Sequence, residues 1–231
     1  MMYKFLESDY TLYGVLCKPG MPQGYTLKDM ADDYAAMIRQ EFDGPVDVLG
    51  ISTGGSIALH FAADHPDLVH HLVIHSSAHT LNPAAKQLQL DVARLAQQGQ
   101  WMKAWAKLVG TMYQQAGFGK WLAQPLVWLS AWLLALSAPK DPTDLVVTVE
   151  AEDQHAFKDR LVEIVASTLI VAGADDFFYS PALFRETADG IPNARLCLYE
   201  KMGHPAGGKR FRRDVLAFLR DKRNPHRVSH H

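Results

Sequence analysis

Apolar residues along the chain gather in five short strand-like runs, and most of these runs are separated by segments with helical periodicity. The runs lie at residues 10–16, 46–50, 72–75, 168–172 and 194–200. Leu27, Met30, Tyr34 and Ile38 recur at helical spacing after the first run, with Thr26 as a plausible N-cap. Further helical patterns cover 54–63, 180–190 and 209–222. Strands that alternate with helices indicate an α/β fold, a mostly parallel sheet with helices on both faces.

One long interval, residues 81–142, has a helical pattern and no strand-like run, and it contains all five tryptophans. A loop of this length without structure of its own is improbable in a compact domain, so we predict an inserted helical cap. Residues 1–80 and 143–222 would form the core, followed by a polar tail at 223–231. The cap tryptophans either join the cap to the core or line an apolar substrate pocket. Pocket candidates are Trp105, Trp128, Trp132 and His75.

Composition narrows the classes of function. The 231 residues have a net charge of −2, which gives no reason to expect nucleic acid or an anionic membrane as a partner. Two distant cysteines argue against a disulfide scaffold or a thiolate metal site, and no histidine pair has a recognised zinc-ligand spacing, so we expect no metal or cofactor. The N-terminus lacks a signal-peptide pattern, and residues 121–138 fall short of a membrane span, so we expect a cytoplasmic protein.

The stretch Gly50-Ile51-Ser52-Thr53-Gly54 joins a predicted strand to a predicted helix. In this setting G-x-S-x-G is typical of a nucleophile elbow, a sharp turn that exposes the serine Oγ at the edge of the sheet. We expect Gly50 and Gly54 to avoid collisions that a Cβ would make. The backbone N–H of Thr53, at the start of the helix, would donate to a developing oxyanion. The alternative is a loop serine in a glycine-rich turn.

A serine nucleophile requires a base, and the base requires a carboxylate that orients it. Asp175 and Asp176 follow the predicted strand at 168–172, and His204 follows the strand at 194–200. The carboxyl ends of parallel strands meet at one edge of a sheet, so these side chains are expected near Ser52. Mechanism does not choose between the two aspartates. Glu150, Glu152 and Asp153 form a second carboxylate cluster. His155 beside them follows no recognisable strand, so we expect it to have a solvated or helix-start role.

The three motifs, in the order Ser, Asp, His, resemble those of the α/β-hydrolase family, with similarity from about Tyr10 to Leu219. The resemblance implies a catalytic triad of Ser52, Asp176 and His204, because the family's acid usually lies three residues beyond the glycine that ends its strand. It also implies that residues 81–142 occupy the family's cap position.

The chain departs from the family at its N-terminal side, where the usual first strands and the HG-type oxyanion loop are not visible. Either the sequence is a shortened form of a longer hydrolase, or residues 10–16 pair with the strand at 46–50 and a second copy covers the free edge, which predicts a homodimer.

We expect a serine hydrolase that cleaves a small or medium apolar carboxylic ester through an acyl-enzyme. Alternatives are acyl transfer or a lyase reaction at the same triad, a hydrolase-like protein that binds an apolar ligand without turnover, or a fragment that folds poorly or only as an oligomer.

Overall fold

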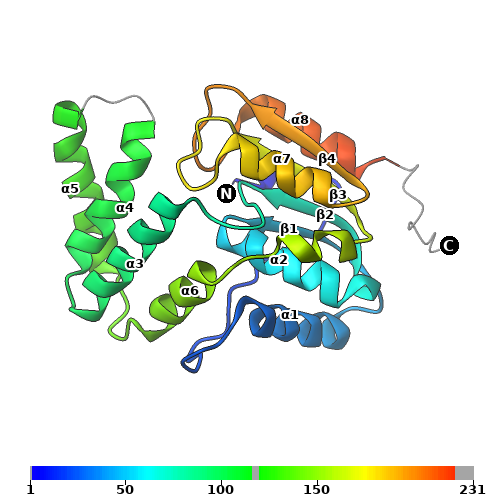
Figure 1. Ribbon diagram of the computed structural model, residues 1–231, viewed down its shortest axis with the longest axis horizontal. Helices are drawn as coiled ribbons and strands as arrows, with labels where there is room; N and C mark the ends of the chain where they lie inside the picture. Colours follow the sequence, from blue (N-terminus) through cyan, green and yellow to red (C-terminus); the bar gives the residue numbers. More distant parts are fainter. Residues whose placement is uncertain (1, 116–119, 222–231) are drawn as a thin grey trace.

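A four-stranded parallel sheet lies at the centre of the computed structural model, which describes residues 2–115 and 120–221 (Figure 1). The strands are β1 (Val46–Ile51), β2 (Val69–His75), β3 (Ser167–Gly173) and β4 (Ala194–Tyr199), in the spatial order β1-β2-β3-β4. Their register pairs Val48 with Leu72, Ile74 with Ile170, and Val171 with Cys197. The predicted α/β fold is confirmed, and four of the five predicted strands are present.

Helices cover both faces of this sheet. The helices of the described chain are α1 (Leu27–Glu41), α2 (Thr53–Asp64), α3 (Pro83–Gln97), α4 (Trp101–Gln115), α5 (Lys120–Leu136), α6 (Thr143–Asp153), α7 (Pro181–Gly190) and α8 (Gly208–Leu219), with short 3-10 helices η1 (Lys4–Leu6), η2 (Pro66–Leu68) and η3 (Lys158–Glu163). Thr26 caps α1 as predicted, because its side chain accepts from the Asp29 N–H while the Asp29 carboxylate accepts from the Thr26 N–H.

Alternate residues of the two central strands belong to two separate apolar clusters. Leu72 and Ile74 of β2 pack in a cluster with residues of α1, α2 and α7. Val73, the residue between them, packs in the other cluster with α8 and Leu6 of η1. Successive side chains of a strand point to opposite faces, so a strand buried on both faces has apolar residues at consecutive positions. This is the physical reason for the continuous apolar run that the sequence shows at 168–172.

The prediction of a strand at residues 10–16 was wrong, and so was its predicted pairing with β1. Tyr10 and Leu12 pack in the α8 cluster, whereas Cys17 packs against Met30 and Tyr34 of α1 on the other face of the sheet. The segment therefore passes from one face to the other beside β1, which ends the sheet in the described part of the chain. Its apolar residues anchor a crossing rather than a strand, and Leu16 is 89% exposed.

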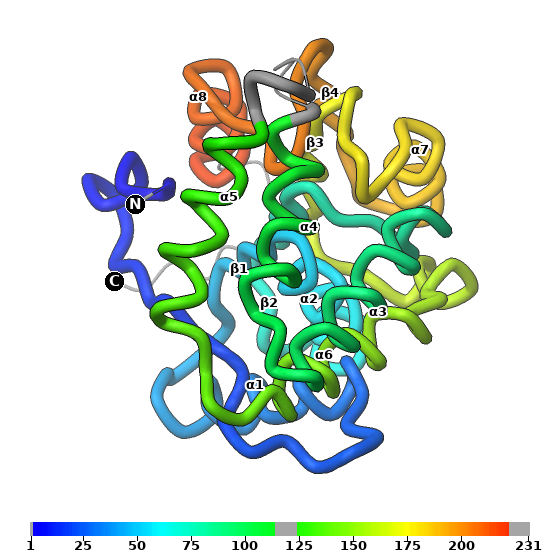
Figure 2. The backbone as a smooth tube through the Cα atoms, turned by 90° about the vertical axis from the view of Figure 1, so that its left-hand side faces the viewer, coloured from blue at the N-terminus to red at the C-terminus, as the bar shows by residue number. Residues whose placement is uncertain are grey.

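Three helices, α3 to α5, stand together to one side of the sheet layers, and we call them the helical insertion (Figure 1). The chain enters them directly from the carboxyl end of β2 and returns through α6. Figure 2 views the molecule from this side, with α4 and α5 in front of the sheet. In the described parts of the chain, no helix has the length and apolar character that crossing a bilayer requires. The predicted tail at 223–231 lies outside the described residues.

Candidate active site

Ser52 lies at the junction of β1 and α2 with φ 53° and ψ −128°, in a region of backbone space that non-glycine residues rarely occupy. The strand-to-helix turn is so tight that a Cβ at Gly50 would lie 2.4 Å from the Gly54 carbonyl oxygen. A Cβ at Gly54 would meet no atom within 4 Å, whereas one at Gly55 would lie 2.4 Å from the Ser77 Cβ. The expected steric role therefore holds for Gly50 but was wrong for Gly54, and Gly55 makes the second close approach.

His204 lies between Ser52 and Asp176. Its Nε2 is 3.1 Å from the Ser52 Oγ, and its Nδ1 is 2.8 Å from the Asp176 Oδ2. The Asp176 side chain is fully buried and the ring of His204 is nearly so. A carboxylate can only accept, so Nδ1 carries the proton in the neutral ring and Nε2 is left to accept from the Ser52 hydroxyl. Three residues far apart in sequence thus form one hydrogen-bonded relay.

The loop after β3 fixes the direction of the Asp176 carboxylate. Its Oδ1 accepts hydrogen bonds from the backbone N–H groups of Phe178 and Tyr179, at 2.8 and 3.3 Å, which leaves Oδ2 for His204. Asp175 has an exposed side chain, and its backbone N–H donates to the Met202 carbonyl at 2.9 Å. The structure therefore brings Asp176, and not Asp175, to the histidine.

The amide of Thr53 begins α2 directly after Ser52. The first N–H groups of a helix have no acceptor within it, and the helix dipole makes this end electropositive. The Ser52 carbonyl accepts from Gly55 at 2.7 Å, which closes the first turn and fixes the orientation of the neighbouring amides. This end of α2 is therefore suited to stabilise negative charge on an atom bound to Ser52.

Glu152, a member of the second carboxylate cluster, lies at the end of α6 and is a buried neighbour of this site. Its Oε1 accepts from the Ser56 Oγ at 2.7 Å and from the Tyr179 hydroxyl at 3.4 Å. Burial raises its pKa above the usual value, against the lowering effect of these hydroxyl groups. The sequence does contain a sign of this burial, because the spacing of Glu152 from Leu145 and Val149 places all three residues on one helical face.

The expectation of a solvated or helix-start role for His155 was wrong, because His155 is buried and lies between α6 and η3. The ring is buried and its Nε2 lies 3.2 Å from the Ala78 carbonyl oxygen. Burial is the largest cause that lowers its pKa to about 3. Because the ring remains neutral at ordinary pH, it serves as a packing residue beneath α2 and not as a charged group.

The four residues named as substrate-pocket candidates lie elsewhere. His75 is fully buried, its Nε2 donates to the Ala206 carbonyl at 2.7 Å, and its Nδ1 accepts from the Tyr3 hydroxyl at 2.8 Å. Its ring stacks on Phe211, so it supports the α8 face and does not line an open pocket.

The three tryptophans belong to the helical insertion. Trp105 is half-buried and stacks on Trp101, with 5.8 Å between ring centroids. Trp128 and Trp132 are 44% and 50% exposed. Trp128 lines a cavity of about 430 Å³ formed by residues of α3, α4 and α5, and this cavity lies within the insertion rather than at the relay.

Comparisons with known proteins point to one family. The family model described as "alpha/beta hydrolase fold" matches residues 16–208. The solved structure of "Putative non-heme bromoperoxidase BpoC" from Mycobacterium tuberculosis is similar with a TM-score of 0.64 and 25% identity, over 86% of this chain and 75% of that one.

Two curated relatives are similar in sequence. One is "Putative carbamate hydrolase RutD" of Klebsiella pneumoniae, 27% identical over 84% of this chain and 71% of the relative. The other is the pimeloyl-acyl-carrier-protein methyl ester esterase of Neisseria meningitidis, 26% identical over 79% of this chain and 70% of the relative.

Proposed function

Since the chain belongs to the alpha/beta hydrolase fold family and is a hydrolase enzyme of that family, we propose that it cleaves a carboxylic ester through an acyl-enzyme formed on Ser52. The observation that supports this most directly is the relay from Asp176 through His204 to Ser52, with distances of 2.8 and 3.1 Å. Such distances allow a histidine to remove a serine proton as the serine attacks a carbonyl carbon.

Each group in the relay has a separate role. The Ser52 Oγ forms a bond to the carbonyl carbon while its proton moves to Nε2 of His204. The imidazolium then gives this proton to the leaving alcohol, and water repeats the sequence in reverse to release the acid. Asp176 stabilises the positive charge that His204 acquires and maintains its tautomer. No step of this sequence requires a group that the chain's own residues and water do not supply.

Charge develops on the carbonyl oxygen as the tetrahedral intermediate forms. The Thr53 N–H at the start of α2 is our proposed donor to this oxyanion, because it follows the nucleophile directly and its helix dipole favours negative charge. One such donor contributes about 2.7–4 kcal/mol to transition-state stabilisation, judged from the loss of a donor in a serine protease.

The substrate class rests on chemistry shared with two relatives. One is named as a methyl ester esterase and one as a carbamate hydrolase. Esters and carbamates both present a carbonyl carbon with a heteroatom leaving group, which is what a serine alkoxide attacks. We propose a small or medium apolar ester because aromatic rings pack around His204: the ring centroids of Phe178 and Tyr179 lie 4.7 and 6.1 Å from that of His204.

A fluorophosphonate probe tests the assembled relay without knowledge of the substrate. We expect one adduct per chain by intact mass, mapped to Ser52 by peptide analysis. Labelling should be absent in Ser52→Ala and strongly slowed in His204→Ala. Asp175→Asn is the matched control for Asp176→Asn, because only Asp176 contacts the histidine.

Folded protein that is not labelled, or a label on another serine, would contradict the proposed nucleophile. A set of p-nitrophenyl esters of increasing chain length then tests the substrate class by their hydrolysis rates. Rates that do not exceed those of Ser52→Ala would contradict ester hydrolysis.

A further inference from the structure

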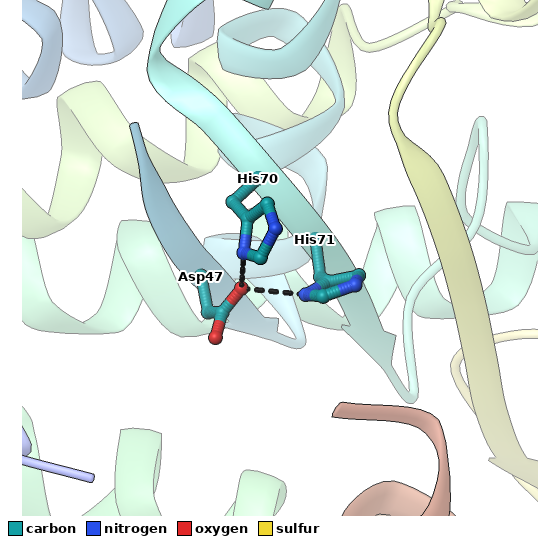
Figure 3. A group of neighbouring side chains, drawn as sticks. All are labelled: Asp47, His70 and His71. Carbon is teal, nitrogen blue, oxygen red and sulfur yellow. Dashed lines mark hydrogen bonds and ion pairs between the residues drawn. The ribbon is translucent and has the colours of Figure 1, made fainter. Parts of the chain in front are cut away.

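A β-bulge near the amino ends of β1 and β2 places three potential metal ligands together. Val46 pairs with Val69, but the next pair is Val48 with Leu72, so Asp47 alone faces both His70 and His71. Successive strand residues normally point to opposite faces, and a bulge redirects one of them. Bulges are rare between parallel strands. In Figure 3 both imidazole rings converge on the Asp47 carboxylate.

The contacts within this group are short and share a single oxygen. The Asp47 Oδ1 lies 2.9 Å from His70 Nδ1 and 2.7 Å from His71 Nδ1. The side chains are 24%, 15% and 2% exposed in the order Asp47, His70, His71, so the group opens to solvent on the Asp47 side. The Nε2 atoms of both histidines are buried and have no hydrogen-bond partner in the described structure. The hydrogen bonds to Asp47 therefore leave each ring only half satisfied.

We propose that Asp47, His70 and His71 form a binding site for a divalent transition-metal ion such as Zn²⁺. Two imidazole nitrogens and a carboxylate oxygen suit this class of ion, whereas Mg²⁺ and Ca²⁺ prefer oxygen ligands. The three ligand atoms lie within 4.8 Å of one another. Ligands of a tetrahedral zinc ion with bonds of about 2.1 Å are about 3.4 Å apart. Binding thus requires the two hydrogen-bonded pairs, now at 2.9 and 2.7 Å, to separate by about 0.5 and about 0.7 Å.

Protons and charges balance in a simple way. In the metal-free state the Nδ1 of each ring donates to the carboxylate, because a carboxylate can only accept. When the ion binds, Nδ1 becomes the ligand, and a ring that keeps one proton carries it on Nε2. Water completes the fourth position on the exposed side of Asp47.

The position of the site defines its role. Asp47 and His70 are each the second residue of their strand, whereas Ser52 follows the last residue of β1. The ion would therefore lie at the amino ends of the strands, whereas the proposed triad lies beyond their carboxyl ends. It would join β1, the end strand of the described sheet, to β2. A ligand that binds only the folded state stabilises it, so we expect metal binding to raise the unfolding temperature without taking part in hydrolysis.

Zinc binding by the full-length chain tests this site. The histidines at 226, 230 and 231 could bind Zn²⁺ themselves. All proteins in this experiment, the parent included, therefore carry glutamine at these three positions. Zn²⁺ affinity is measured by competition with a chromophoric chelator, and the unfolding temperature is measured with and without Zn²⁺. We expect one ion per chain, an affinity at least about tenfold lower in His70→Gln and in Asp47→Asn, and a smaller rise in unfolding temperature in both variants.

His65→Gln is the matched control, because His65 pairs with Asp32 at 2.7 Å but has no second imidazole on that carboxylate. It should bind Zn²⁺ as the parent does. The Co²⁺ complex of the parent should show the visible absorption of a tetrahedral ion, which His70→Gln should lose. The proposal is overturned if the folded parent does not bind Zn²⁺, or if His70→Gln and Asp47→Asn bind it as tightly as the parent.

Discussion

Adding a methyl group at Gly50 tests whether the elbow geometry depends on the close approach seen in the structure. A Cβ there would lie 2.4 Å from the Gly54 carbonyl oxygen and 2.8 Å from both the Ala58 Cβ and the Gly55 Cα. Favourable carbon contacts lie at about 3.5–4.0 Å. Two of these three atoms are backbone atoms of α2, so relief requires the helix to move away from β1.

The expected change in the free energy of unfolding differs between Gly50→Ala and Gly54→Ala, although both glycines belong to the same motif. Overpacking of this kind costs about 1–3 kcal/mol, and we expect Gly50→Ala near the upper end because backbone must shift. Gly54→Ala adds a Cβ in open space within a helix, where alanine is favoured over glycine by roughly 0.5–1 kcal/mol. A displacement of about 1 Å at a reacting group lowers the rate by about 10²-fold, so Gly50→Ala should also label slowly with a fluorophosphonate.

Urea unfolding gives the free energy of unfolding of both variants, and the labelling rate of Ser52 reports the geometry of the elbow. Gly55→Ala should behave like Gly50→Ala, because its Cβ would lie 2.4 Å from the Ser77 Cβ. If Gly50→Ala is as stable as Gly54→Ala and labels as fast, the steric account of the elbow is refuted.

Three further predictions concern ionisable groups. Asp176→Asn should lower kcat by about 10⁴-fold with little change in stability, measured on a p-nitrophenyl ester, because the asparagine amide favours the wrong tautomer of His204. Burial raises the pKa of Glu152 in the folded state, so the free energy of unfolding falls as pH rises above the ordinary pKa of a glutamate. Glu152→Gln should therefore be more stable than the parent at neutral pH, and the difference should disappear in acid. Burial lowers the pKa of His75 to about 4, so the folded protein should lose on the order of 3 kcal/mol as pH falls from about 6.5 to 4. Urea unfolding across this pH range should show a flatter profile in His75→Gln.

The sequence predicts the central strands and the relay for a clear physical reason. β2 and β3 are buried on both faces, so each has consecutive apolar residues at its centre, 72–74 in β2 and 169–172 in β3. Ser52 follows β1 directly, and Asp176 and His204 lie in the short loops after β3 and β4. Parallel strands bring their carboxyl ends to one edge. At these positions the local sequence pattern is enough to predict both the strands and the place of the three relay residues at one edge of the sheet.

Features that depend on contacts between distant segments could not be predicted in the same way. The apolar residues at 10–16 anchor a crossing between two layers, which gives the same pattern as a strand. Glu152 is polar, and its burial follows from the hydroxyl groups that Ser56 and Tyr179 bring to it. The pairing of Asp47 with two histidines depends on one extra residue in β2, which no periodicity reveals.

The proposed triad depends on backbone approach as much as on its three side chains. A Cβ at Gly173 would lie 2.1 Å from the Met202 carbonyl oxygen and 2.6 Å from that of Gly203, so the end of β3 and the His204 loop can meet only with glycine there. Ser52 directly follows β1, which is the end strand of the described sheet. Its carboxyl end is held by the hydrogen bond from the Ser52 N–H to the His75 carbonyl. Its amino end is held by Asp47 against the two histidines of β2. The proposed metal ion would therefore strengthen the attachment of β1, the strand that positions the nucleophile, to β2. For this reason, removal of the ion should lower the unfolding temperature before it lowers the rate of hydrolysis.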